Sequence, residues 1–111
     1  MPSTTLARGN SISTFYIGPT LTNTSNTLAA NTTTAVSYTI PGLLASDYVF
    51  VQGVVGTQAA GVIIAEADVT AANTLQIQYG NLTANASLVP ASGVYLIEVV
   101  RLEGSLPANA A

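Results

Sequence analysis

The chain has 111 residues, enough for one domain with a single hydrophobic core. Only 6% of the residues are charged, where a soluble domain usually carries about 25%, and 49% are hydrophobic. Arg8 and Arg101 are the only cations, and Lys, His and Cys do not occur. The composition therefore argues against nucleic acid as a partner, because phosphate binding needs clustered cations. It also excludes a disulfide framework and a thiolate metal site.

The near absence of charge favours a surface that other protein molecules cover. Monomers usually protect strand edges and solubility with scattered Lys and Glu, whereas this chain uses Thr, Ser, Asn and Gln. Interface cores are depleted in charge, so we expect a homo-oligomer, a trimer more than a dimer. A Thr-rich β domain that tolerates a neutral surface is the alternative.

Membrane insertion is not expected, because the most apolar stretch, residues 54–65, falls short of the roughly 20 residues that a span needs.

The first third of the chain is mainly polar. Residues 1–13 mix Ser, Thr, Gly and Pro without periodicity and predict an extended N-terminal arm. A first strand is expected over residues 14–17, ended by Gly18-Pro19. The Asn/Thr-rich residues 20–33 predict either a long loop or a weak edge strand.

Two strand patterns occupy the middle of the chain. Residues 35–40 alternate between apolar and polar side chains, and Pro41-Gly42 closes this strand as a turn. Its inward positions are Val36, Tyr38 and Ile40. Asp47 precedes a continuous apolar run over residues 48–51, which predicts a strand with both faces covered.

Three further strands are expected over residues 62–69, 74–79 and 94–102, with a turn at residues 70–73. In the first of them one face is predicted to hold Ile63, Ala65, Ala67 and Val69. The second alternates strictly, with Leu75, Ile77 and Tyr79 inward. We expect the core to include Tyr38, Phe50, Ile77 and Ile97.

No window sustains a helical period of 3.6 residues, and β-branched residues with Tyr dominate the apolar positions. Six or seven strands separated by turns predict an all-β fold, an antiparallel β-sandwich or jelly roll. The expected organisation is an arm over residues 1–13, a β-sandwich domain over residues 14–103 and a C-terminal tail over residues 104–111.

Catalytic side chains are scarce, since the usual general base, thiolate nucleophile and Schiff-base amine are all missing. Glu66 and Asp68 are the only acidic pair close in sequence, about 7 Å apart on one face of a strand. The pair fits a solvated face best, a calcium site less well and a glycosidase pair least. We expect no enzymatic activity, no catalytic or metal-binding residues, no cofactor and no small-molecule substrate.

The remaining functional candidates are interface residues. Leu6, Arg8 and Ile12 are the side chains with which the arm could dock on a neighbour. Arg101, near the end of the last strand, either caps the rim of the core or anchors an interface.

Five tyrosines could stack on sugars, although each lies in a strand where a core role is expected. Four glycosylation sequons are expected to be chance occurrences; they begin at Asn23, Asn31, Asn81 and Asn85.

Several segments, taken in order and spacing, resemble small virion proteins of tailed bacteriophages over residues 34–102. The shared features are a strand ending in a turn at Pro41-Gly42-Leu43, an aspartate before the apolar residues 48–51, residues 67–77 and a last strand ending in Arg101. The sequence departs from the pattern at residues 52–56, where such proteins often carry Asn-Lys-Pro.

The resemblance implies a capsid decoration (cement) protein on the outer surface of the virion, with the major capsid protein as its partner and no enzymatic activity. A head-fibre or tail component and a carbohydrate-binding module are the alternatives.

Overall fold

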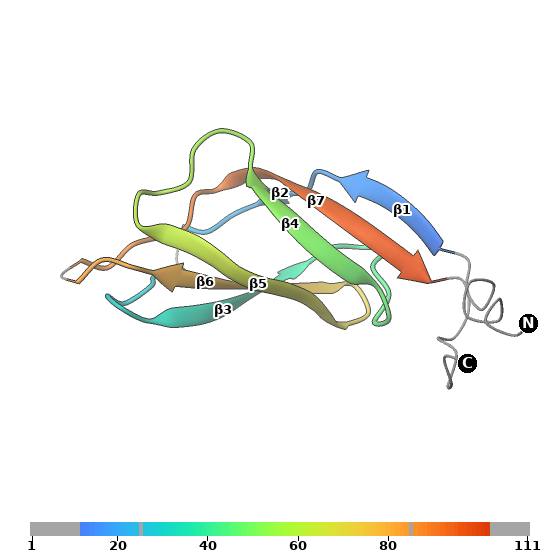
Figure 1. Cartoon of the computed structure of the whole chain (residues 1–111), viewed down its shortest axis with the longest axis horizontal. Coiled ribbons are helices and arrows are strands. Elements are labelled where there is room, and N and C mark those ends of the chain that lie inside the picture. Colours follow the sequence, from blue (N-terminus) through green and yellow to red (C-terminus); the bar gives the residue numbers. More distant parts are fainter. Residues whose placement is uncertain (1–11, 25, 85, 103–111) are drawn as a thin grey trace, which may run out of the picture.

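The computed structural model describes residues 12–24, 26–84 and 86–102. It is an all-β structure of two antiparallel sheets packed together as in a β-sandwich (Figure 1), which confirms the all-β, sandwich-like part of the expected fold class. Residues 1–11 of the predicted arm and the predicted C-terminal tail lie outside the described residues. The strands are β1 (Ile12–Ile17), β2 (Thr20–Leu21), β3 (Thr33–Thr39), β4 (Tyr48–Val54), β5 (Val62–Ala71), β6 (Thr74–Asn81) and β7 (Gly93–Leu102). Within these residues, no helix has the length and apolar character needed to cross a membrane.

The first sheet is built around β7, which pairs with β1 and β2 along one edge and with β4 along the other. β1 and β2 follow β7 in the same register, with Ile17 opposite Ile97 and Thr20 opposite Val94. They therefore form one edge strand that is interrupted at Gly18-Pro19, where proline has no N–H to donate. β1 begins at Ile12, two residues earlier than the sequence indicated.

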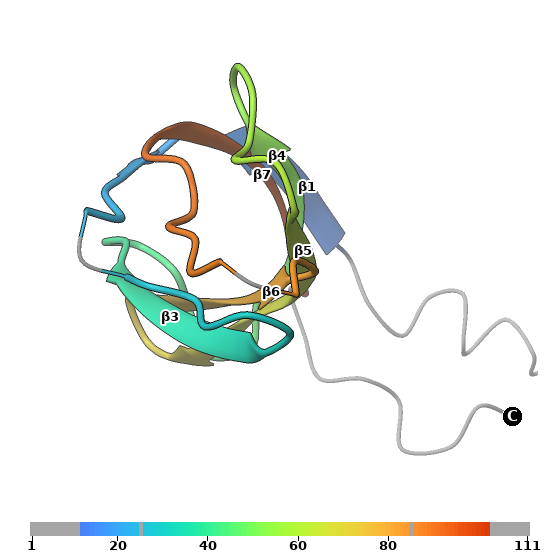
Figure 2. The same ribbon diagram turned by 90° about the vertical axis from the view of Figure 1, so that its left-hand side faces the viewer.

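The second sheet has the order β3–β6–β5. β4 and β5 follow each other in the chain and lie side by side at one seam between the sheets (Figure 2). The turn between β5 and β6 is tight, and Asn73 takes the left-handed conformation there, with φ of 63°.

The core is formed where β6 and β7 face each other across the sandwich. β6 contributes Leu75, Ile77 and Tyr79, and β7 contributes Tyr95, Ile97 and Val99, all of them fully buried. The core positions expected for Ile77 and Ile97 are thus confirmed. Tyr38 is half-buried, with its ring packed against this cluster.

The expectation that Phe50 is a core residue is wrong, since its side chain is 56% exposed. Only one face of β4 packs on the core, where Val49 is buried, while Tyr48 and Phe50 point to the outside. A continuous apolar run therefore does not mean here that both faces of the strand are covered. The cause is topological, because the described residues place no third layer over this sheet.

A β-bulge changes the inward face of β5. The pairing with β6 shifts by one residue between Ile64 and Glu66, so that β5 carries one extra residue at Ala65. The inward positions are consequently Val62 and Ile64 before the bulge and Ala67 and Val69 after it. The expectation that Ile63 and Ala65 share a face with Ala67 and Val69 is therefore wrong, and the side chain of Ile63 is 43% exposed.

Candidate interaction surface

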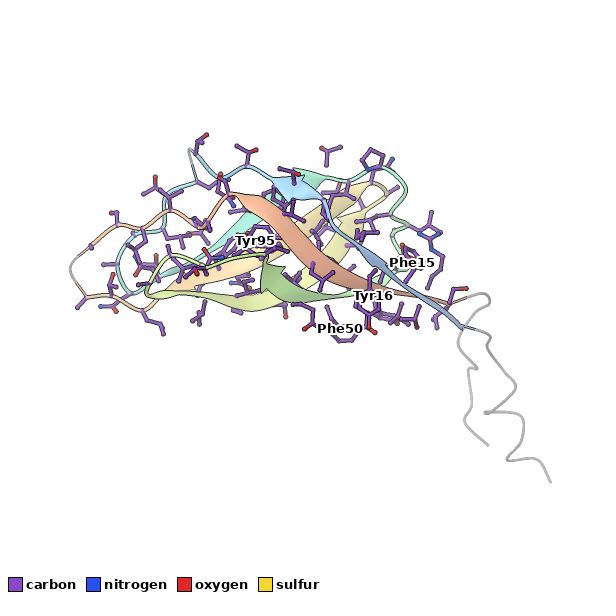
Figure 3. All side chains as sticks on the ribbon, turned by 90° about the horizontal axis from the view of Figure 1, so that it is seen from above. Phe15, Tyr16, Phe50 and Tyr95 are labelled. Carbon is purple, nitrogen blue, oxygen red and sulfur yellow. The ribbon has the colours of Figure 1, made fainter. Side chains whose placement is uncertain are left out.

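Aromatic and aliphatic side chains cover the outer face of the β1–β7–β4 sheet. The strand register places Tyr16, Glu98 and Phe50 in one row across the three strands. Val100 and Tyr48 belong to the neighbouring row, and Leu96 lies in the row on the other side of Glu98. We call this surface the aromatic face; it consists of Tyr16, Tyr48, Phe50, Leu96, Glu98 and Val100. Tyr16 and Phe50 project from the same side of the sheet (Figure 3).

The aromatic rings of this face are open to solvent. The exposed fractions are 62% for Tyr16, 50% for Tyr48 and 56% for Phe50, and Leu96 is 41% exposed. Isolated apolar residues are common on protein surfaces, but a contiguous patch is typical of an interaction site. Tyr and Phe are also enriched in protein interfaces, so the aromatic face is the best candidate for a functional surface.

Glu98 is the one charged side chain on the aromatic face. It lies between Tyr16 and Phe50 in the strand register and is partly buried. Among the described residues, no cation forms an ion pair with it. A partner on this face therefore meets an apolar surface with one central acceptor.

The outer face of the β3–β6–β5 sheet has the opposite character. Hydroxyl and amide side chains cover it, and Glu66 and Asp68 lie opposite Gln78 and Gln76. Both carboxylates are exposed, as expected for a solvated face. Among the described residues, no group of three or more metal-binding side chains comes together. Among these residues, the fold therefore brings no further carboxylate beside Glu66 and Asp68 that could complete a calcium site.

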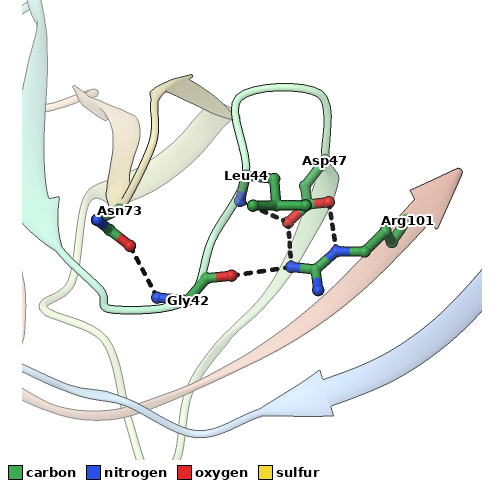
Figure 4. A network of polar contacts seen from close by, with 5 residues as sticks. All are labelled: Gly42, Leu44, Asp47, Asn73 and Arg101. Atoms are coloured by element: carbon green, nitrogen blue, oxygen red, sulfur yellow. Dashed lines mark hydrogen bonds and ion pairs between the residues drawn. The ribbon is translucent and has the colours of Figure 1, made fainter. Parts of the chain in front are cut away.

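Arg101 is engaged within its own chain (Figure 4). Its Nε and Nη2 donate to the two carboxylate oxygens of Asp47 at 2.9 and 2.8 Å, and Nη2 also donates to the carbonyl of Gly42 at 2.9 Å. The N–H of Leu44 donates to the same carboxylate. The guanidinium carbon lies 5.2 Å from the centre of the Phe15 ring. This arrangement ties the loop between β3 and β4 to β7, which is a structural role at the rim of the core.

The electrostatics of this contact follow from its geometry. The hydrogen bonds from Arg101 lower the pKa of Asp47, and the N–H of Leu44 acts in the same direction against the effect of burial. The carboxylate in turn raises the pKa of Arg101. Both groups are thus charged at neutral pH.

The other predicted interface residues are placed only in part. Leu6 and Arg8 lie outside the described residues. Ile12 is the first residue of β1 and pairs with Leu102, so its backbone belongs to the sheet and not to an arm.

Two networks of polar groups lie inside the sandwich. In the first, the hydroxyl of Tyr38 donates to Asn23 Oδ1 and lies 2.8 Å from the hydroxyl of Tyr79. Burial raises the pKa of both tyrosines, most strongly that of Tyr79. In the second, Asn81 Nδ2 donates to the carbonyls of Leu28 and Ala86. Both networks join groups of this chain to one another and fix loops against the strands of the sandwich.

The same contacts bear on the glycosylation sequons. Asn23 and Asn81 are 0% and 2% exposed, and their amide nitrogens donate to backbone carbonyls. A glycan cannot be attached to either nitrogen in the folded protein. Asn31 is exposed, and Asn85 lies outside the described residues.

Comparison with known proteins gives no match, because no protein-family model, no curated protein and no solved structure is significantly similar to this chain. The function must therefore be argued from the aromatic face and from the composition of the chain.

Proposed function

We propose that this protein is a non-enzymatic structural component of a tailed-bacteriophage virion, a cement protein that binds the outer surface of the capsid. The observation that carries the proposal is the aromatic face, on which Tyr16, Tyr48 and Phe50 are half or more exposed around a single carboxylate. In a chain with seven charged residues, such a face lacks the charges that keep a free surface soluble. The resemblance of residues 34–102 to small phage virion proteins points in the same direction.

The physical mechanism of a cement protein is mass action. A protein that binds the assembled shell and not its dissociated subunits shifts the equilibrium toward the shell. Repetition of the site over a symmetric lattice and association between copies add avidity, so a weak single contact is sufficient. In this proposal the aromatic face binds the major capsid protein, and the hydrophilic outer face of the β3–β6–β5 sheet, which carries Glu66 and Asp68, remains in solvent.

The copy number in purified particles tests this function and separates it from a head-fibre or tail component. Particles of the phage that encodes the chain are purified by density gradient, and the chain is quantified against the major capsid protein by mass spectrometry. We expect a copy number of the same order as that of the capsid protein. A few copies per particle would indicate a vertex or tail component, and absence from particles would contradict a virion role.

A carbohydrate-binding module is the second candidate, and one observation favours it. Tyr16 and Tyr48, for which the strand pattern predicts a core role, are 62% and 50% exposed, which gives the chain an aromatic platform for stacking on sugars. A glycan array with the purified chain separates the two functions, because saturable glycan binding that Phe50→Ala abolishes would favour the module.

A further inference from the structure

One edge of β1 pairs with β7, and the opposite edge lies beside an open cleft between the two sheets. The cleft has a volume of about 390 Å³ and separates β1 from the segment that follows β3. Phe15 and Ile17 line it on one side, and Ile40 and Leu43 on the other. Ile40 and Leu43 belong to the core, and Arg101 is the one charged residue among those described that lines the cleft, so the cleft is a largely apolar opening onto the core.

The strand register shows which backbone groups of β1 are free. The N–H of Tyr95 donates to the carbonyl of Pro19, and β1 continues the register of β2 along β7. Backbone groups alternate between the two edges of an antiparallel strand, so the odd-numbered residues of β1 direct theirs to β7. Thr14 and Tyr16 direct theirs to the other edge. In the part of the chain that the structure describes, no hydrogen bond reaches the backbone of Thr14 or Tyr16 from that side.

This edge also lacks the features that prevent strand addition. Protein edges are commonly protected by charged residues, proline or β-bulges. The sequence of β1, Ile12–Ile17, has no charge and no proline, and its ladder with β7 has no register shift. β4 and β5 both contain bulges. The edge of β1 is therefore a regular, uncharged template next to an apolar cleft.

We propose that β1 accepts an extended strand from a second copy of this chain, and that this strand is the N-terminal segment, residues 3–7. The segment is uncharged, rich in Thr and free of Pro and Gly, which suits a strand. Its alternation separates Leu6 from Thr5 and Ala7, so that Leu6 enters the cleft while its neighbours face solvent. The C-terminal residues 103–111 fit less well, because Pro107 follows Leu106 and has no N–H for pairing.

The hydrogen-bond pattern explains why a second copy is the occupant. In the same chain, Gly9-Asn10 predicts a two-residue hairpin turn before β1. A hairpin closed at that turn would make Leu6 and Ser13 a hydrogen-bonded pair. Ser13, however, is an odd-numbered residue of β1 and directs its backbone groups to β7. The segment of another molecule is free of this constraint and can meet Thr14 and Tyr16 in register.

The chain has no cysteine, so engineered disulfides locate the segment without background. Full-length Leu6→Cys and Pro41→Cys variants, carrying tags of different mass, are mixed and mildly oxidised. We expect a mixed disulfide, because Pro41 is exposed and lines the cleft. A chain that carries both Leu6→Cys and Pro41→Cys should form disulfides between molecules and not within one molecule. Absence of the mixed product, or a disulfide formed only within one chain, would overturn the proposal.

A second measurement tests the edge itself by sedimentation equilibrium of the full-length chain. Thr14→Pro removes the outward N–H and leaves the bonds to β7 in place, whereas the matched Thr14→Ala retains that N–H. We expect Thr14→Pro to weaken self-association at least tenfold and Thr14→Ala to leave it unchanged; equal effects would contradict strand addition.

If Thr14→Pro does not fold, as judged by its thermal unfolding, a second pair of variants decides the question. Leu6→Asn should weaken self-association, and Leu6→Met should not; equal association of these two would overturn the proposal. None of these measurements uses particles, and the proposal does not depend on the capsid, so its failure and that of the proposed function are separate results.

Discussion

Asp47 and Arg101 form a bidentate ion pair, although they lie 54 positions apart in the chain. The carboxylate is fully buried, and the guanidinium is 29% exposed. Asp47 precedes β4, and Arg101 lies near the end of β7, so the pair fixes the loop between β3 and β4 against the first sheet. The guanidinium also covers the ring of Phe15 at the rim of the core.

Loss of this pair should destabilise the fold. Arg101→Ala leaves the buried carboxylate of Asp47 without its main hydrogen-bond donor, which is costly for a charge out of water. We expect a clear decrease in Tm for Arg101→Ala and a smaller decrease for Arg101→Lys, which retains the charge but not the planar fork. Thermal unfolding followed by circular dichroism measures both. An unchanged Tm in Arg101→Ala would mean that the contact has no structural weight.

The pair should also determine part of the acid sensitivity. The folded protein holds the pKa of Asp47 below its ordinary value, so the ionised carboxylate contributes stability above the unfolded pKa of about 3.9. That contribution is lost as the pH falls through the folded pKa. We therefore expect Asp47→Asn to lose less of its own stability than the wild type as the pH falls from about 5 to about 2, because this window begins above the unfolded pKa and extends below it. Urea unfolding at stepped pH tests this, and parallel curves would contradict it.

A core residue of the second sheet and an outer-face residue of the first sheet should respond differently to truncation. Ile77 is fully buried, so Ile77→Ala should decrease the free energy of unfolding by about 2–5 kcal/mol. Phe50 is 56% exposed, so Phe50→Ala should change it by about 0.5 kcal/mol or less. Denaturant unfolding of both variants supplies the comparison. A large loss in Phe50→Ala would contradict the placement of its side chain on the outer face.

The buried tyrosines should make the protein sensitive to alkali. Burial and the hydrogen bond with Tyr38 raise the pKa of Tyr79 in the folded state. Stability is therefore fully present below the unfolded tyrosine pKa of about 10 and is lost as the pH rises above it. Ultraviolet titration should show that Tyr79 ionises only with unfolding, and Tyr79→Phe should reduce the alkaline loss. Reversible ionisation of all five tyrosines in the folded chain would contradict this.

The periodic parts of the fold could be predicted from the sequence, and the irregular parts could not. Strict alternation over residues 74–79 placed Leu75, Ile77 and Tyr79 correctly, because β6 is paired on both edges and has one covered face. The bulge at Ala65 left no mark in the composition, so the face of Ile63 was assigned wrongly. A bulge depends on how two strands pair, which a single strand does not reveal.

The aromatic face was missed for a related reason. The apolar run at residues 48–51 has the composition of a strand covered on both faces, and only the layer arrangement shows that Tyr48 and Phe50 lie outside. A signal was present in β7, where Glu98 occupies an outward position between two apolar ones. The partner of Arg101 was also hidden, because the 54-residue separation from Asp47 becomes a contact only in the folded chain.

Binding of purified variants to particles that lack the chain is the most direct test of the aromatic face. The Phe50→Ser and Tyr16→Ser double variant is compared with the wild type and with a Glu66→Gln and Asp68→Asn variant on the opposite sheet. Bound protein is quantified after sedimentation of the particles. We predict at least tenfold weaker binding for the first variant and wild-type binding for the second, because interface aromatics carry a large share of binding energy. Wild-type binding by the Phe50→Ser and Tyr16→Ser variant would contradict the assignment of this face to the capsid.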